Sequence, residues 1–315
     1  MWLTILNSLA PVIILIGLGV VLRASGFLSD EFLAGINRLC FYVSLPALLI
    51  QKIAATRVAG GVAFQISLVL LLGMLICLVI GYVLALILRL PSPTMGSFVQ
   101  ASFRGNLAYV GLPIVLYSLA AARGDGLGPL ESIAVLAFAP MVPAYNLVSV
   151  LILSLHGRKD KGARWHELVR QVLTNPLILG SVVGFSLMAM RWPLPDAADR
   201  TLAALGNVAL PLMLLAIGAS LSLERVKGRL LHSASAAFVK CMIAPLVGVL
   251  LAHYLGLDKD QTAIALIYLA CPTAVVSYVM AEQLGADEVL AGSAVVLSTL
   301  FSFVPLAVVV ACTAH

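Results

Sequence analysis

A polar segment interrupts a long apolar stretch of the chain, where Arg104, Asn106 and Tyr109 precede Gly111 and Pro113. Because proline lacks a backbone donor and crowds the preceding turn, we expect the helix to break near Asn106 to Pro113. The second half-helix would then begin with free N–H groups, which favour an anion. The alternative is a simple proline kink in which the Asn106 amide bonds to a loosened carbonyl.

A second interruption lies at Pro272, which is followed by Thr273 and Ser277. These two hydroxyl residues are four apart, so they share one face if a helix resumes directly after the proline. On that face they could meet a substrate or an ion opposite Asn106. Alternatively, each hydroxyl bonds to a carbonyl one turn earlier in its own helix, as serine and threonine commonly do in apolar helices.

Two charged side chains stand inside apolar segments of the second half of the chain. Glu282, followed by Gln283, is a candidate for proton or cation coupling, although a solvated position at the membrane surface would also explain it. Lys240 lies more than a turn from either end of its segment and needs a partner or a water-filled cavity. It could supply counter-charge for an anion, as Arg104 could, pair with Glu282, or snorkel to the interface.

Other features favour packing over catalysis. Asn146 could line a polar site or join two helices through its amide, and Gly180 and Gly184 predict close helix packing, inside the chain or between copies. The five cysteines are scattered singly, the histidines lie at or near the ends of apolar segments, and paired carboxylates are absent. We therefore expect no enzyme, no metal site and no cofactor, and the sequence carries no nucleotide-binding motif.

The elements that must position these residues are membrane helices. Hydrophobic residues make up 62% of the 315 residues, charged residues 10%, and the mean hydropathy is +1.09, whereas soluble domains are about 45–50% apolar and roughly 25% charged. Alternating strand patterns are absent, so the fold class is an all-α integral membrane protein. At roughly 20 residues per crossing, we predict about ten spans, at 2–23, 32–53, 62–88, 94–120, 131–155, 167–190, 201–222, 230–255, 260–284 and 288–312.

We predict two repeats of five spans, residues 1–156 and 166–315, divided by a basic cytoplasmic linker at 157–165. Because each repeat has an odd number of spans, the second enters the membrane from the opposite side, which is typical of transporters. The loops on the linker's side are richer in Lys and Arg, so both termini are expected to be extracytoplasmic. These cations orient the spans, and the net charge of +5 therefore does not indicate a nucleic-acid partner.

Several motifs taken together resemble the auxin efflux carrier family over nearly the whole chain. They are Ile36-Asn37-Arg38 with Pro46, the Asn106-to-Pro113 segment, Asn175-Pro176, Lys240 with Pro245, and Pro272 with Ala281-Glu282. The resemblance implies ten spans in two inverted repeats, as in bile acid:sodium symporters and sodium/proton antiporters, with broken helices four and nine crossing at the substrate site. It also implies a scaffold of spans one, two, six and seven, a moving transport unit formed by the other spans, and a homodimer through the scaffold.

The resemblance also suggests a substrate class. In the plant members an asparagine at the first crossing meets the auxin carboxylate, and it maps onto Asn106. The short basic linker replaces the long central loop of the large plant carriers and resembles prokaryotic members, which are usually described as carriers of malonate, malate or related acids. The implied substrates are therefore small organic anions, and auxin itself is not implied.

We expect a secondary or potential-driven carrier of small carboxylates, of the elevator type, in the inner (cytoplasmic) membrane. Export is favoured because each negative charge that leaves the cell gains roughly 2.3 kcal/mol per 100 mV. The alternative is a sodium-coupled symporter of the bile acid type, with oxygen ligands from Asn106, Thr273, Glu282 and Gln283. The residues predicted to bind substrate are Asn106, Arg104, Tyr109, Asn146, Thr273, Ser277 and Lys240.

Overall fold

The computed structural model describes residues 2–55, 61–123, 128–157, 170, 173–221 and 230–313. Within these residues the chain is helical and forms no strand. Six helical segments are long and apolar enough to cross a membrane by length and composition, and shorter apolar helices cover Ala10–Ala24, Leu107–Ser118 and Pro176–Ala189. The helical membrane fold predicted from composition is therefore confirmed at this level.

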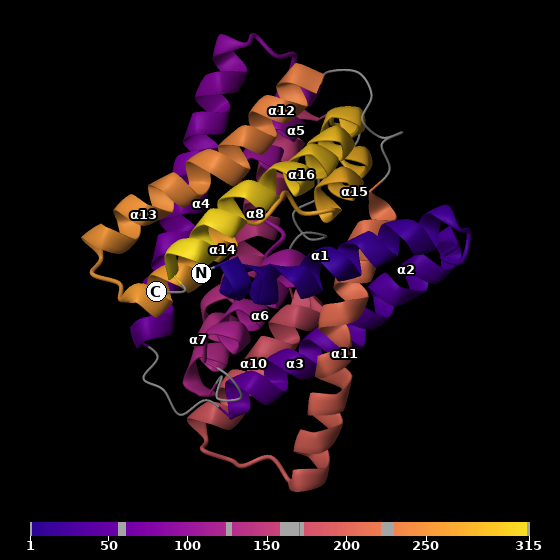
Figure 1. Cartoon of the computed structure of the whole chain (residues 1–315). Helices are drawn as coiled ribbons and strands as arrows, with labels where there is room; N and C mark the ends of the chain where they lie inside the picture. The colour runs from indigo at the N-terminus through magenta and orange to yellow at the C-terminus, as the bar shows by residue number, and fades with distance from the viewer. Residues whose placement is uncertain are drawn as a thin grey trace.

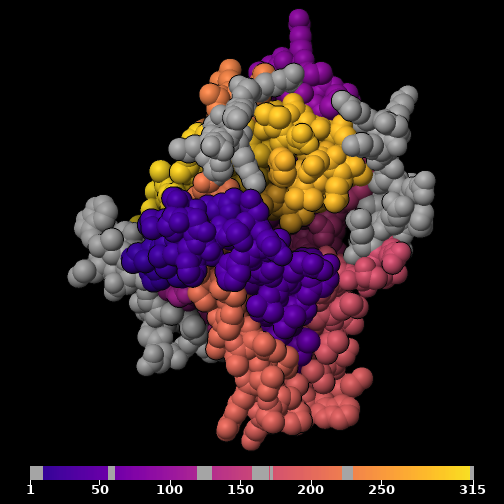
Figure 2. Space-filling model, turned by 90° about the vertical axis from the view of Figure 1, so that its right-hand side faces the viewer, coloured from indigo at the N-terminus to yellow at the C-terminus, as the bar shows by residue number. Residues whose placement is uncertain are grey.

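A first group of helices packs together around α11. In this group α1 lies against α11, and α3 lies against both α10 and α11. Figure 2 shows the indigo N-terminal helices crossing one face of the molecule, between the yellow C-terminal residues and the orange to red residues of α10 and α11. The members of this first group are α1 (Trp2–Ala24), α2 (Asp30–Leu39), α3 (Leu45–Ala54), α10 (Pro176–Ala189) and α11 (Asp196–Ser220).

A second group contains the remaining helices and is held together by α4, α5 and α14 (Figure 1). It meets the first group where α1 packs against α6 and α16, and where α3 packs against α7. Its members are α4 (Gly61–Ile87), α5 (Ser92–Phe103), α6 (Leu112–Arg123), α7 (Gly128–Phe138), α8 (Met141–His156), α12 (Leu230–Phe238), α13 (Ala244–Tyr254), α14 (Lys259–Ala270), α15 (Val276–Gln283) and α16 (Glu288–Thr313).

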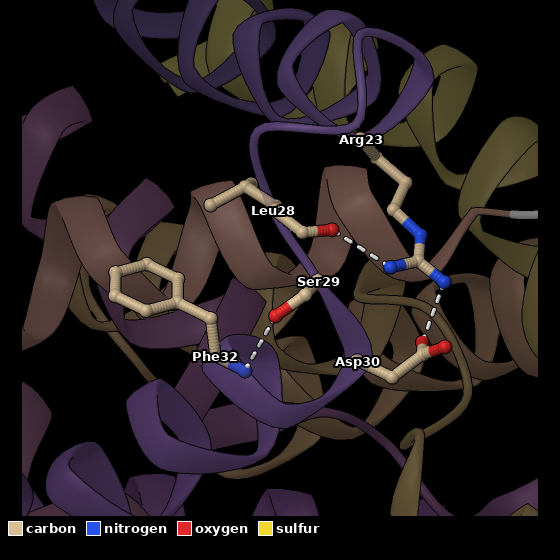
Figure 3. Close-up of polar contacts among 5 residues, drawn as sticks. All are labelled: Arg23, Leu28, Ser29, Asp30 and Phe32. Carbon is tan, nitrogen blue, oxygen red and sulfur yellow. Dashed lines mark hydrogen bonds and ion pairs between the residues drawn. The ribbon is translucent and has the colours of Figure 1, made fainter.

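Ion pairing and capping fix the corner between α1 and α2 (Figure 3). The Ser29 hydroxyl caps α2 by accepting from the Phe32 N–H at 3.2 Å. Arg23, in the last turn of α1, donates to the Leu28 carbonyl at 2.7 Å and pairs with Asp30 in the first turn of α2. Each charge lies at the helix end that its sign stabilises, so these contacts tie the start of α2 to the end of α1.

Wide π-helical turns precede three prolines at the same spacing. These turns are η1 (Cys40–Ser44), η2 (Leu107–Gly111) and η5 (Val239–Ile243), and each ends two residues before Pro46, Pro113 or Pro245. In a regular helix the proline ring would clash with the carbonyl four residues earlier, and a wider turn moves that carbonyl aside. The chain therefore remains helical at Pro113, where the sequence suggested a break.

The predicted spans coincide with helical segments in the described residues. The predicted spans 62–88, 201–222 and 288–312 correspond to α4, α11 and α16, which differ from them by a few residues at their ends. In span 167–190 the continuous helix covers Pro176–Ala189, and most of the linker 157–165 lies outside the described residues. The number of ten crossings and the inverted relation of the two halves stay predictions.

Two glycines allow α10 to approach α3 closely. A Cβ on Gly180 would lie 3.0 Å from the Pro46 Cα, and a Cβ on Gly184 would lie 2.8 Å from the Ile53 Cβ. Of the two alternatives that the sequence left open, this glycine pair therefore serves packing inside the chain.

We predict that Gly184→Ala destabilises the protein, because the added methyl group meets Ile53 in a close-packed interface. The expected loss is about 1–3 kcal/mol in the free energy of unfolding, measured by thermal unfolding in detergent. The matched control is Gly17→Ala in α1, where a Cβ would meet nothing within 4 Å. Equal unfolding temperatures for the two variants would contradict the packing role.

Candidate functional site

The two predicted interruptions are real breaks in the helices. After α5 ends at Phe103, residues 104–106 are not helical, and η2 then begins at Leu107. After α14 ends at Ala270, the chain becomes helical again at Val276, the start of α15. The first break is shorter and lies earlier than the predicted region from Asn106 to Pro113, because the wide turn η2 accommodates Pro113. Pro272 lies within the second break, as predicted.

The two breaks run antiparallel and bond to each other. The Asn106 N–H donates to the Pro272 carbonyl at 2.8 Å, and the Ala274 N–H donates to the Arg104 carbonyl at 3.2 Å. Between these bonds Gly105 lies opposite Thr273 in an isolated bridge. We call residues 104–106 and 271–274 the crossing. Broken backbone in an apolar interior needs such bonds, and here each broken helix supplies them to the other.

Thr273 stabilises the crossing through both its backbone and its side chain. Its hydroxyl donates to the Ala101 carbonyl in the last turn of α5 at 2.9 Å, and its N–H donates to the Ser298 hydroxyl of α16 at 2.9 Å. The prediction that Thr273 and Ser277 share one helical face is wrong, because α15 begins only at Val276. The Thr273 hydroxyl therefore caps the C-terminal end of α5. Ser298, which the sequence did not single out, holds the second break through its bond to the Thr273 N–H.

Unpartnered polar atoms lie where α5 packs against α15. The Ser277 hydroxyl and the Gln100 Oε1 are buried without a hydrogen-bond partner. The Gln100 Nε2 contacts the Met280 sulfur at 3.8 Å, which joins the two half-helices. The sequence singled out Ser277 for its hydroxyl. Gln100 was missed, although an amide in an apolar helix was itself a signal.

Arg104 is buried at 6% exposure and points toward α8. It donates to the Asn146 Oδ1 at 2.7 Å, to the Ser149 hydroxyl at 2.8 Å and to the Tyr145 carbonyl at 3.3 Å, whereas its Nε has no partner. Asn146 thus joins two helices, which was one of its two predicted roles, and Ser149 adds an acceptor that the sequence did not reveal. All these acceptors are neutral, so none of them compensates the positive charge of the guanidinium.

Lys240 is 1% exposed and lies in the wide turn η5. Its ammonium group donates to the Leu269 carbonyl in the last turn of α14, so snorkelling to the membrane surface is wrong. A cation at a helix C-terminus complements the negative end of the helix dipole. The lysine stem passes Gly105, where a Cβ would lie 3.0 Å from the Lys240 Cε. Both cations therefore adjoin the crossing.

The crossing is a positive centre without a compensating carboxylate. In the described residues the ion pairs are Arg23–Asp30 and Lys52–Glu131, and neither includes Arg104 or Lys240. The described buried polar and charged side chains likewise include no Asp or Glu. Because burying an unpaired charge is costly, the two buried cations make the crossing the candidate site for a negatively charged ligand.

The helix ends that follow the breaks carry no acidic residue. Neither η2 nor α15 has an acidic residue in its first turn or a side-chain cap. Asn106 precedes η2 at 7% exposure, and its carbonyl accepts from the Val110 and Gly111 N–H groups at 3.1 and 3.0 Å. Its side-chain amide makes no hydrogen bond within the part of the chain that the structure describes. This amide is free to bind a ligand.

Tyr109 and Gly111 connect η2 to its surroundings. The Tyr109 hydroxyl lies 3.5 Å from the Asn37 carbonyl of α2, so it reaches the first helix group. A Cβ on Gly111 would lie 2.7 Å from the Tyr268 ring, whose hydroxyl donates to the Ala134 carbonyl at 3.0 Å. Gly111 therefore lets η2 pack on α14 beside the crossing.

Glu282 and Gln283 lie apart from the buried cations. Both side chains are exposed at the C-terminal end of α15. The structure therefore does not bring Glu282 to Lys240, and the predicted alternative of a solvated carboxylate fits its position. Among the described residues no group of three or more His, Cys, Asp or Glu side chains could hold a metal ion.

We predict that Thr273→Val destabilises the crossing, because it leaves the Ala101 carbonyl buried without its donor. The expected loss is about 1–3 kcal/mol in the free energy of unfolding, measured by thermal unfolding, and Thr273→Ser should preserve most of the stability. The control is Thr201→Val in α11, where the exposed hydroxyl donates to the Ala197 carbonyl of its own helix. A control that loses as much stability as Thr273→Val would refute the crossing-specific role.

Comparisons with known proteins identify the family of this chain. The family model for membrane transport proteins matches residues 4–310. An uncharacterized transporter of Methanocaldococcus jannaschii is 20% identical over 303 residues, which cover 94% of each chain. An uncharacterized transporter of Methanothermobacter thermautotrophicus is 24% identical over 312 residues, which cover 95% of each chain. The chain therefore belongs to the membrane transport protein family, the family of the auxin efflux carriers, and is a multi-pass membrane transporter.

Proposed function

We propose that this transporter is a secondary carrier of small organic anions, whose carboxylate binds at the crossing. The observation that carries the proposal is the pair of buried cations, Arg104 and Lys240, which have no carboxylate partner in the described residues. A bound carboxylate would supply the missing negative charge. A cationic substrate at the same place would add to an uncompensated positive charge, which is unfavourable in a medium of low dielectric constant.

In this proposal each residue has a different task. The free amide of Asn106, together with the N–H groups at the start of η2, binds the carboxylate. Arg104 and Lys240 supply counter-charge, and Asn146 holds the guanidinium in place.

The residues around the breaks keep the site in shape. Pro272 lies within the second break, and Thr273 holds the two breaks together through its bonds to α5 and α16. Gly111 lets η2 pack on α14 beside the crossing, and Pro113 lies in the helical chain that follows η2. Tyr109 and Ser277 lie on the two helix segments that lead away from the crossing, η2 and α15.

The two helix groups suggest how the substrate moves. The bonds of the crossing lie within the second group, whereas the first group packs around α11 and meets the second group through α1, α3 and α11. We propose that the second group is the transport unit, that the first is the scaffold, and that they move relative to each other in an elevator-type cycle. Breaks in the fourth and ninth predicted spans support two inverted repeats of five spans.

The charges support a proposal for the direction and coupling of transport. With the cytoplasm negative, an exported anion gains roughly 2.3 kcal/mol per charge and 100 mV, so export needs no coupled ion. Glu282 and Gln283, which a sodium-coupled symporter would use, are exposed, and the Thr273 hydroxyl already donates to Ala101. We therefore propose uncoupled export across the inner membrane, with the cytoplasmic side at the basic linker.

Thermal stabilisation by ligands tests the binding site directly. We predict that at least one acid among acetate, malonate, malate and indole-3-acetate raises the unfolding temperature of the purified protein, with or without sodium, and that Asn106→Ala removes this effect. The control is Asn207→Ala, which removes an exposed amide of α11. Stabilisation by sodium alone, unchanged in Asn106→Ala, would instead support the sodium-coupled symporter.

Adding a resident carboxylate tests the role of the buried charge. We predict that Asn146→Asp lowers the affinity for the stabilising anion by about tenfold or more, because the new carboxylate would neutralise Arg104 from 2.7 Å. The comparison is Ser149→Ala, which removes one hydrogen bond from the same guanidinium and leaves its charge unpaired. Binding is measured by ligand-induced thermal shift at several anion concentrations. Unchanged affinity in Asn146→Asp would exclude Arg104 as the counter-charge.

A further inference from the structure

An ion pair between α3 and α7 bridges the two helix groups, and neither of its residues belongs to the crossing. The Lys52 ammonium in the last turn of α3 lies 2.7 Å from the Glu131 carboxylate in the first turn of α7. The neighbouring Ser132 hydroxyl donates to the Lys52 carbonyl at 3.2 Å. Two successive residues of α7 thus bind one residue of α3, and each charge lies at the helix end that favours its sign.

Other polar contacts nearby stay within one group. The Arg23–Asp30 pair joins α1 to α2, and the Gln51 amide donates to the Asp199 carboxylate of α11 at 3.2 Å, both inside the first group. The Lys52 and Glu131 side chains are only 20% and 19% exposed, against 36% and 88% for Arg23 and Asp30. Water therefore screens the bridging pair less than it screens the exposed pair.

We propose that the Lys52–Glu131 ion pair, together with the bond from Ser132 to the Lys52 carbonyl, is a latch that holds the two groups in the present conformation. The proposal rests on the relative movement of the two groups proposed above. When α7 moves past α3, the two charges separate and become hydrated, and the pair forms again on return. A partly exposed pair is worth little enough to open reversibly, yet enough to set the balance between conformations.

The test compares variants that remove the ion pair with a control variant at Gln51, the residue next to Lys52 on α3. Lys52→Met and Glu131→Gln each remove the ion pair, the charge exchange Lys52→Glu with Glu131→Lys restores it in reverse, and Gln51→Leu removes the contact inside the first group. Spin labels on cysteines at Arg200 of α11 and Lys259 of α14, both exposed, report the distance between the groups. The five native cysteines are replaced in this background. The distribution of distances between the labels is measured by pulsed electron–electron double resonance in lipid nanodiscs without ligand.

We expect Lys52→Met and Glu131→Gln to raise the population of a second label distance roughly fivefold. The charge exchange should return most of the population to the first distance, and Gln51→Leu should leave the distribution unchanged. Identical distributions in all variants would overturn the latch, as would an equal shift in Gln51→Leu.

The outcome for the latch is separable from that for the anion site. If the variants shift the label distances while no anion stabilises the protein, the latch stands and the carboxylate proposal fails. If an anion binds in an Asn106-dependent way while Lys52→Met and Glu131→Gln behave like the unaltered protein, the anion site stands and the latch fails.

Discussion

The structure depends on one constraint, which is that backbone groups exposed by a broken helix must find partners in an apolar interior. Two breaks meet this constraint jointly. The Asn106 and Ala274 N–H groups donate to carbonyls of the opposite break, and the Thr273 hydroxyl donates to the end of α5. Neither break could exist alone at this depth without leaving several groups unpaired. The crossing is therefore a single unit that two distant parts of the sequence build together.

The same constraint arranges the charges at the crossing. A break creates a negative helix end and a positive helix end. The negative end of α14 receives the Lys240 ammonium, which donates to the Leu269 carbonyl, whereas Arg104 follows α5 but directs its guanidinium to α8. The positive ends that begin η2 and α15 receive no acidic residue. The absence of a resident anion at these described positive ends supports the anionic substrate proposed above over a cationic one.

Sequence reasoning found the breaks but not the partners of each polar group. Proline, glycine and polar residues in apolar segments are local signals, so Arg104 to Pro113 and Pro272 could be singled out. The position of Pro113 within a helix could not be predicted, because the wide turn η2 depends on how the chain packs. Snorkelling of Lys240 was a reasonable alternative, since only the contact with Leu269 across a second helix distinguishes the two positions.

Long-range contacts also decided between alternatives that composition left open. Asn146 could have lined a cavity, but the approach of α5 brings Arg104 to it. Gly180 and Gly184 could have joined two copies of the chain, but α3 fills their groove. Ser298 and Ser149 gave no signal because serine is common in apolar helices, where it bonds to its own backbone. These two hydroxyls matter because each accepts a hydrogen bond from a residue of the crossing, Ser149 from Arg104 and Ser298 from the Thr273 N–H.

The distribution of polar bonds argues for movement of whole helix groups over rearrangement of the crossing. The bonds that hold the crossing join α5, α8, α14, α16 and η5, all within the second group. The polar links between the groups in the described residues include those of Tyr109, Glu131 and Ser132, and the Tyr109 contact is long at 3.5 Å. Opening the crossing would leave buried backbone groups unpaired, whereas sliding the groups breaks fewer of the bonds named here and leaves those of the crossing intact. This distribution supports the proposed elevator-type cycle, in which the crossing stays intact while the two groups move relative to each other.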